Sequence, residues 1–302
     1  MSKRSAIHWY GGKHYMTGKL LSLIPPHKIY VEPYGGAAYL LINKEPSPVE
    51  IYNDVHSGLV ALFKVLRDKE KFDIFHNLLQ LTPYSEEEFY HCKHTWQEET
   101  DEVEKAYKFL VCTRMSFNSK GRTFAYSHSA SVRGMAKATS AWLSVVDEQL
   151  PIIAERLRMV QVEHVDGLRC IERHDDENAF MYLDPPYPDE SRRELRAYKY
   201  EMSISQHEEL LDFIKQGKSK FLVSSYSNEM YDTALAGWNS TTFEVQLRAT
   251  NQRVNEEGQR RIEKLWWNYE LLELRQTYGG WCDTNIRNGL IAQKKANKSE
   301  GD

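Results

Sequence analysis

The residues with the clearest chemical potential are Asp184-Pro185-Pro186-Tyr187, which directly follow the apolar run 180–183. Two consecutive prolines fix φ and remove two backbone donors, so the chain leaves the end of a strand in one rigid direction. The Asp184 carboxylate and the Pro185 carbonyl can both accept hydrogen bonds from an amino group, while Tyr187 offers a flat face for a base. An ordinary turn is the alternative, because Pro-Pro and Asp-Pro are common in turns. The position after a strand favours a site that acts on an exocyclic amine.

A second group of residues follows another short apolar run and reads Glu32-Pro33-Tyr34-Gly35-Gly36. The glycines let the backbone approach a ligand closely, and the next helix would present its N-terminus there. Because the fingerprint G-x-G-x-x-G is absent, NAD and FAD are disfavoured. Asp54 ends the next expected strand, at a spacing that suits a carboxylate binding ribose hydroxyls. The alternative is that Asp54 only caps the following helix.

A third group lies near the amino terminus and reads His8-Trp9-Tyr10-Gly11-Gly12-Lys13. Aromatic side chains, two glycines and a lysine suit a loop that folds over a ligand, with Lys13 placed to meet a carboxylate. Taken alone, a terminal segment with a chance lysine would be the simpler interpretation.

The elements around these motifs predict a doubly wound α/β sheet with a helical insert. Apolar and β-branched runs predict strands at 29–31, 49–53, 159–164, 179–183 and 220–225, and a late hairpin at the sheet edge formed by 242–247 and 262–269. Helical spacing predicts helices at 37–43, 58–66, 72–79, 85–96, 103–112, 141–157 and 205–215. We therefore assign residues 1–58 and 160–302 to a catalytic domain and 59–159 to an inserted domain.

Charge is distributed unevenly along the 302 residues, although the net charge is only −4. The stretch 105–146 contains no acidic residue and carries Lys105, Lys108, Arg114, Lys120, Arg122, Arg133 and Lys137. A local basic face of this kind suits phosphate binding, and an ordinary solvated segment is the alternative. The four cysteines form no C-x-x-C pair, which indicates neither a disulfide framework nor a zinc site and fits a reducing cytoplasm. No 18-residue apolar stretch predicts a membrane span.

Taken together, Trp9-x-Gly-Gly-Lys13, Val31–Gly36, Asn53-Asp54 and Asp184–Tyr187 resemble the Dam-like family of DNA adenine methyltransferases, in the family's order and over nearly the whole chain. The resemblance implies a Rossmann-like methyltransferase sheet, S-adenosylmethionine as cofactor and no metal. It assigns catalysis to Asp184, Pro185, Pro186 and Tyr187. It assigns cofactor binding to Trp9, Lys13, Glu32, Tyr34, Gly35, Gly36, Asp54, Asp166 and Asp184, with Asp166 near the cofactor's adenine.

The insert resembles the family's DNA-entering hairpin at Thr113–Asn118 and Gly121-Arg122. The resemblance places Phe117 and Asn118 near a flipped adenine and gives Arg122 a base to read, since guanidinium to guanine is the commonest specific contact. The implied DNA contacts are His8, Arg114, Phe117, Asn118, Lys120, Arg122, Arg133 and Lys137. Three departures stand out: Ala37 replaces a glycine, Asn118-Ser119 replaces Asn-Gly, and His8 replaces a lysine. Because of the last two, no particular target sequence is carried over.

The implied partner is double-stranded DNA, with one adenine extruded so that its 6-amino group reaches the methyl donor. A bacterial or phage-encoded monomer in the cytoplasm is expected, and a cognate restriction endonuclease is a candidate partner. A cytosine 4-amino or RNA adenine methyltransferase remains an alternative, because both substrates present an exocyclic amine. Another is a DNA-binding relative that has lost catalysis. A small-molecule methyltransferase would have no use for the basic insert.

Overall fold

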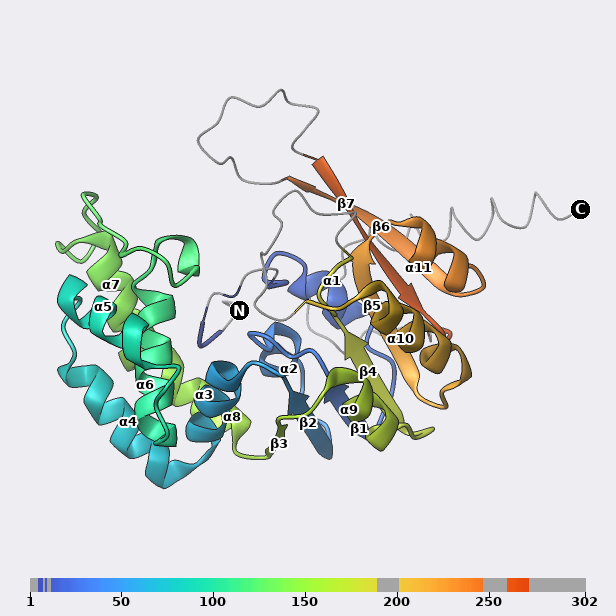
Figure 1. Cartoon of the computed structure of the whole chain (residues 1–302), viewed down its shortest axis with the longest axis horizontal. Coiled ribbons are helices and arrows are strands. Elements are labelled where there is room, and N and C mark those ends of the chain that lie inside the picture. Colours follow the sequence, from blue (N-terminus) through green and yellow to red (C-terminus); the bar gives the residue numbers. More distant parts are fainter. Residues whose placement is uncertain (1–4, 8, 10–11, 189–200, 247–259, 272–302) are drawn as a thin grey trace, which may run out of the picture.

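The computed structural model describes residues 5–7, 9, 12–188, 201–246 and 260–271, with only the backbone described at 244–246 and 260–261. Its centre is a seven-stranded sheet in the order β3-β2-β1-β4-β5-β7-β6 (Figure 1). Strands β1 to β5 are parallel, and β7 runs antiparallel between β5 and β6. The strands are β1 Ile29–Glu32, β2 Val49–Asn53, β3 Val160–Glu163, β4 Ala179–Leu183, β5 Lys220–Tyr226, β6 Asn239–Gln246 and β7 Arg260–Trp267.

Two groups of helices accompany this sheet in Figure 1. Those close to the sheet are α1 Thr17–Ser22, α2 Tyr39–Asn43, α9 Gly167–His174, α10 Ile204–Gln216 and α11 Glu229–Ala234. Those of the insert are α3 Ser57–Arg67, α4 Lys69–Leu81, α5 Glu86–Thr95, α6 Glu102–Arg114, α7 Lys137–Leu143, the π-helix η2 Ser144–Gln149 and α8 Leu150–Leu157. Within the described residues, no helix combines the length and the apolar character that crossing a bilayer requires. The predicted doubly wound α/β architecture is confirmed.

Each face of the sheet supports its own apolar core, because successive strand residues point to opposite sides. Tyr30 and Phe180 belong to the core that the sheet shares with the insert helices. Val31 and Met181 belong to the core beneath α9, α10 and α11. The insert thus continues one face of the sheet through α3, which contacts both β3 and α6. The division at residues 58 and 159 remains a prediction.

The insert helices begin at side-chain caps that the sequence supplies. Asp68, Ser85 and Asp101 each accept a hydrogen bond from a backbone N–H in the first turn of α4, α5 and α6. The single helix predicted at 141–157 is instead three segments, α7, η2 and α8. Pro151 in the first turn of α8 lacks an N–H, so the preceding turn cannot keep regular i→i−4 bonding and widens into a π-helix. The late hairpin of β6 and β7 at the sheet edge is confirmed.

Candidate active site

The candidate site lies between β1 and β4, where the strand order reverses. The chain continues from β1 to β2 on one side, while β4 and β5 extend the sheet on the other. Ligands of open α/β sheets bind outside the carboxyl ends of the strands at such a point. Glu32 ends β1, Asp54 follows β2 and Asp184 follows β4, so three carboxylates reach the same edge.

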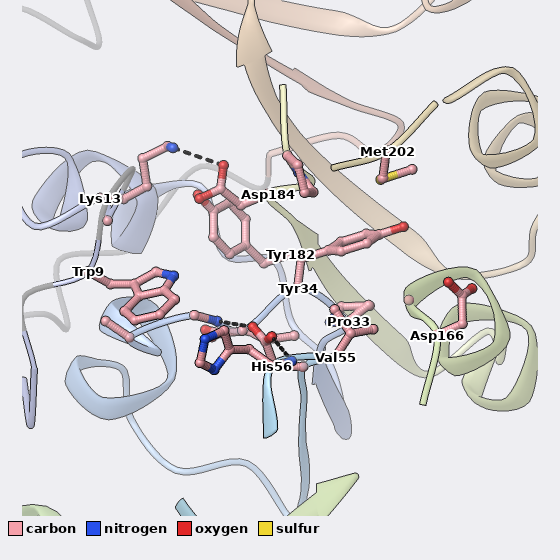
Figure 2. Close-up of a pocket in the computed structure, with 18 of the residues that line it drawn as sticks. Trp9, Lys13, Pro33, Tyr34, Val55, His56, Asp166, Tyr182, Asp184 and Met202 are labelled. Carbon is pink, nitrogen blue, oxygen red and sulfur yellow. Dashed lines mark hydrogen bonds and ion pairs between the residues drawn. The ribbon is translucent and has the colours of Figure 1, made fainter. Parts of the chain in front are cut away.

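A cavity of about 550 Å³ occupies this edge and falls within the usual size of small-molecule sites. Figure 2 shows Trp9 and Lys13 on one side of it, Asp184 with Tyr182 above, and Asp166 on the opposite side. All nine residues predicted to bind the cofactor line it: Trp9, Lys13, Glu32, Tyr34, Gly35, Gly36, Asp54, Asp166 and Asp184. Of the tetrapeptide, Pro186 also lines the cavity, whereas Pro185 is buried beside it.

The lining residues that were not predicted include His56, Tyr182 and Met202. The alternation of β4 could have indicated Tyr182, since it shares a sheet face with Phe180. His56 caps α3 by accepting a hydrogen bond from Leu59, and its ring meets Trp9 edge-on at 5.1 Å. No sequence motif marks His56 or Met202.

The glycine turn after β1 is held by Asp54. Its Oδ2 accepts from the Gly36 N–H at 2.9 Å and its Oδ1 from the His56 N–H at 2.8 Å. Gly36 has a φ of 51°, which favours glycine. At Gly35 a Cβ would lie 2.2 Å from the Tyr52 ring, so any larger residue would push the turn off β2. Asp54 therefore shapes the turn as well as lining the cavity.

Glu32 is a buried carboxylate at the floor of the site. Its Oε1 accepts from the Tyr30 hydroxyl at 2.6 Å and from the Leu41 N–H at 2.7 Å. Burial raises the pKa of Glu32 to about 7, against these hydrogen bonds, which lower it. A cationic ligand group in the cavity would favour the ionised form.

The described residues hold Asp184 through one of its two oxygens. Lys13 Nζ lies 2.8 Å from Oδ1 (Figure 2). The Ser224 hydroxyl donates to the same Oδ1 at 2.8 Å. Among the described residues, Oδ2 accepts no hydrogen bond. Burial alone would lower the pKa of Lys13, but the Asp184 and Glu263 carboxylates raise it well above its ordinary value, so the amine stays protonated. Neither Ser224 nor Glu263 was predicted.

Tyr187 is more enclosed than a stacking surface requires. Only 5% of it is exposed, its ring meets Tyr226 edge-on at 4.6 Å, and Lys13 Nζ lies 4.8 Å from the ring centre. Stacking of a base on Tyr187 stays a prediction, and it would require the ring to become accessible.

The insert contains a hairpin at the position that the sequence indicates, and its entry into DNA stays a prediction. Phe117 N donates to Thr123 O, and Ala125 N donates to Met115 O, both at 2.8 Å. At its tip Asn118 and Ser119 both have left-handed φ angles of 53° and 55°. Phe117 is 60% exposed, and Asn118 and Arg122 are exposed as well. The hairpin thus presents an apolar and a basic side chain to solvent.

Several basic residues of the insert contact other parts of the protein, so fewer of them are exposed as a basic face than the sequence indicates. The Arg114 guanidinium donates to the backbone oxygens of Ser5 and Ala6 at 2.9 and 2.8 Å, so its Nε and Nη2 are engaged within the protein, and its contact with DNA stays a prediction. Lys108 pairs with Glu99 at 2.6 Å and Arg133 pairs with Glu148. These acids lie outside the acid-free stretch and reach it only in the fold. Arg122 and Lys137 are exposed, Lys120 is half-buried, and His8 lies outside the described residues.

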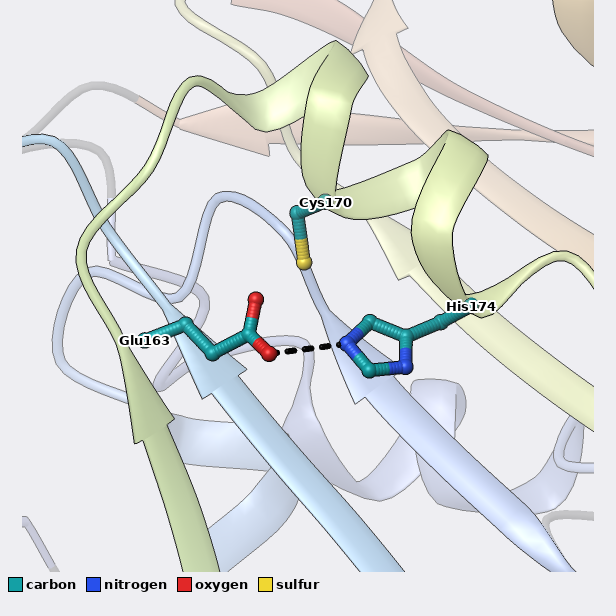
Figure 3. A group of neighbouring side chains, drawn as sticks. All are labelled: Glu163, Cys170 and His174. Carbon is teal, nitrogen blue, oxygen red and sulfur yellow. Dashed lines mark hydrogen bonds and ion pairs between the residues drawn. The ribbon is translucent and has the colours of Figure 1, made fainter.

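A group with metal-binding residue types lies elsewhere, at the β3 edge of the sheet. The donor atoms of Glu163, Cys170 and His174 lie within 4.8 Å of one another (Figure 3). His174 Nε2 and Arg173 Nη1 each lie 3.0 Å from the Glu163 carboxylate. Burial raises the pKa of the Cys170 thiol to about 12, which keeps it protonated. The ion pairs of Glu163 and the burial of Cys170 explain why these three residues lie together, without a metal ion.

Comparison with known proteins adds one finding. A family model described as D12 class N6 adenine-specific DNA methyltransferase matches residues 9–253, which include the Lys13, glycine-turn and tetrapeptide motifs as well as the insert. No curated protein matches the chain.

Proposed function

The chain belongs to the D12 class N6 adenine-specific DNA methyltransferase family, and we propose from this that it methylates a flipped adenine with S-adenosylmethionine as donor. The reaction class, methylation of adenine in DNA, comes with the family. The identity of the donor, the extrusion of the base and the roles of individual residues are the proposal. One observation carries it: the cavity joins the eight other predicted cofactor residues to the Asp184 carboxylate, whose Oδ2 accepts no hydrogen bond from the described residues.

The cavity suits S-adenosylmethionine in its chemistry. The cofactor has an ammonium group, a ribose diol, an adenine and a positively charged sulfur. The carboxylates of Glu32, Asp54 and Asp166 are distributed around the cavity, and Trp9 adds an aromatic wall. Glu32 suits the ammonium because a cation favours its ionised form. Asp54 suits the ribose, and Asp166, at the side opposite Lys13, suits the adenine.

When bound, S-adenosylmethionine supplies a methyl group that is electrophilic without further activation. The chain's own task is therefore to orient the amine and to accept its proton. Asp184 Oδ2 accepts a hydrogen bond from one N–H of the adenine amino group, and the Pro185 carbonyl accepts from the other. These bonds turn the nitrogen lone pair out of the ring plane. The proton released as the N–C bond forms leaves to Asp184 or to water.

The insert supplies the grip on DNA in this proposal. A stacked adenine cannot present its amino group to the cavity, so it is rotated out at a cost of a few kcal/mol. Phe117 and Asn118 at the hairpin tip occupy the vacated space, Arg122 reads a base, and Lys120 and Lys137 contact phosphates. Arg133 joins them if DNA displaces its partner Glu148. The enzyme is proposed to act as a cytoplasmic monomer, with a restriction endonuclease as a candidate partner.

A methyl-transfer assay tests the proposal. Tritiated S-adenosylmethionine is incubated with unmethylated duplex DNA, with RNA or with neither, and labelled nucleosides are separated. We expect label in N6-methyladenine from DNA only. Label in N4-methylcytosine, label in RNA, or no label at all would contradict the proposal.

A further inference from the structure

Glu263 is an ionisable residue in an apolar place. On β7 it shares a sheet face with Leu265 and Trp267, and only 3% of it is exposed. Burying a carboxylate on such a face is costly unless it is well paired. Its cation is Lys13, whose Nζ lies 3.9 Å from Glu263 Oε1 but 2.8 Å from Asp184. Two carboxylates thus share one ammonium, which is a poor arrangement for stability alone.

The contacts of Glu263 lead to the tetrapeptide by two routes. One route runs through Lys13 to Oδ1 of Asp184. The other runs through Tyr226, which faces Glu263 in the β5–β7 register and whose ring packs edge-on against the Tyr187 ring at 4.6 Å. Glu263 therefore lies beside two residues that contact the functional ends of the tetrapeptide, Lys13 at Asp184 and Tyr226 at Tyr187.

We propose that Glu263 is a positioning residue for methyl transfer, holding Lys13 on Asp184 Oδ1 and Tyr187 against Tyr226, so that Asp184 Oδ2 stays directed to the substrate amine. The inference deepens the proposed function and rests on it. Glu263 touches neither substrate nor cofactor in this account. It acts through Lys13 and Tyr226, and the alignment of these residues is the reason that a buried carboxylate is kept at this position despite its cost in stability.

The role proposed for Glu263 can be detected through the pH at which Lys13 loses its proton. Among the described residues, the groups facing Lys13 include Asp184, Glu263, Tyr182 and Tyr15, with the Tyr187 ring beside them. Burial lowers the pKa of Lys13, and the two carboxylates raise it above its ordinary value. Removing the Glu263 charge leaves Asp184 as the nearest anion, so Lys13 loses its proton at lower pH. A neutral Lys13 no longer holds Asp184, and the rate falls at that pH.

The test compares Glu263→Gln with Lys264→Gln in the full chain. Lys264 is the next residue on β7, points to the other face and pairs with Asp232. Single-turnover methylation of duplex DNA is measured across pH, together with S-adenosylmethionine affinity and Tm. For Glu263→Gln we expect an about 10- to 100-fold slower reaction. The alkaline limb of the pH–rate profile of Glu263→Gln should move to lower pH. Its affinity for S-adenosylmethionine should be unchanged, and its Tm should not fall. Lys264→Gln should match the wild type in rate and pH profile.

A wild-type rate in Glu263→Gln, or an unmoved alkaline limb, overturns the inference alone. A loss of Tm in that variant with no change of the pH profile assigns Glu263 a structural role and also overturns it. Glu263→Asp, which keeps the charge, should be slower but keep the wild-type limb, and a limb shifted as in the Gln variant contradicts the inference. An inactive wild type overturns the proposed function, and this inference with it.

Discussion

Lys13 and Asp184 form an ion pair of 2.8 Å, although they lie far apart in the sequence. Lys13 precedes the first strand of the sheet, and Asp184 follows β4. The pair occupies only Oδ1, which Ser224 also binds. A carboxylate fixed through one oxygen can present the other to a substrate, which is the role that we propose for Asp184 Oδ2.

Ser224 provides the first prediction. Ser224→Ala removes a charge-assisted hydrogen bond to Oδ1, so Asp184 can rotate and single-turnover methylation should slow by about tenfold. Cofactor affinity should not change. The matched control is Ser225→Ala, because Ser225 is equally buried and its hydroxyl has no hydrogen-bond partner among the described residues. Equal rates in the two variants would show that Ser224 does not position Asp184.

Glu32 predicts how cofactor binding depends on pH. Its pKa is raised to about 7, so the carboxylate is mostly protonated below that pH and charged above it. If Glu32 holds the ammonium of S-adenosylmethionine, calorimetry should give tighter binding at pH 8 than at pH 6. Glu32→Gln should bind more weakly and lose this dependence, whereas the exposed Glu45→Gln should keep it. A dependence that persists in Glu32→Gln would assign it to another group.

The raised pKa of Glu32 also makes the stability of the fold depend on pH, in the direction opposite to that of cofactor binding. Because the folded pKa exceeds the unfolded value, Glu32 favours the folded state most at low pH. That contribution is lost as pH rises through about 7. Tight cofactor binding opposes the loss.

Replacing Ser119 by glycine should increase the stability of the protein. Its φ of 55° is a left-handed conformation that costs a non-glycine residue, whereas glycine adopts it freely. After the entropy cost of glycine, Ser119→Gly should stabilise the protein by about 0.5–1 kcal/mol, measured by denaturant unfolding. Lys120→Gly is the control, because φ at Lys120 is −85° and glycine should only destabilise there. Destabilisation by Ser119→Gly would mean that the serine side chain contributes more than the strain costs.

Arg122 and Lys137 should differ in what they do to DNA binding. Arg122→Ala should relax the choice of target sequence more than it weakens general affinity, because a base contact is lost. Lys137→Ala should weaken binding to all sequences and reduce its salt dependence. The measurement is binding to a randomised duplex pool at two salt concentrations. A uniform loss of affinity in Arg122→Ala would make that arginine a phosphate contact.

The sheet and the cavity could be predicted largely from the sequence because their signals are local. Glycine turns and the tetrapeptide directly follow apolar runs, and the carboxyl ends of parallel strands meet at one edge. For this reason the nine predicted cofactor residues lie together. The doubly wound architecture and the late hairpin follow from the alternation of strands and helices along the chain.

The supporting contacts could not be predicted because they join residues that are distant in sequence. Ser224 and Glu263 lie on β5 and β7, and nothing near them in the chain marks their role. The acid-free stretch was misleading for a similar reason, since Glu99 and Glu148 lie just beyond it and fold back onto Lys108 and Arg133. Arg114 was assigned to DNA, but its partners Ser5 and Ala6 come from the amino-terminal segment.

The most direct test of the account is single-turnover methylation by Asp184→Ala, measured beside its affinities for S-adenosylmethionine and duplex DNA. Lys13 keeps Glu263 as a partner in this variant, so the fold should persist. We expect methyl transfer to be abolished while DNA binding survives. Turnover close to that of the wild type would contradict the proposed role of Asp184, because its Oδ2 would then not orient the adenine amine.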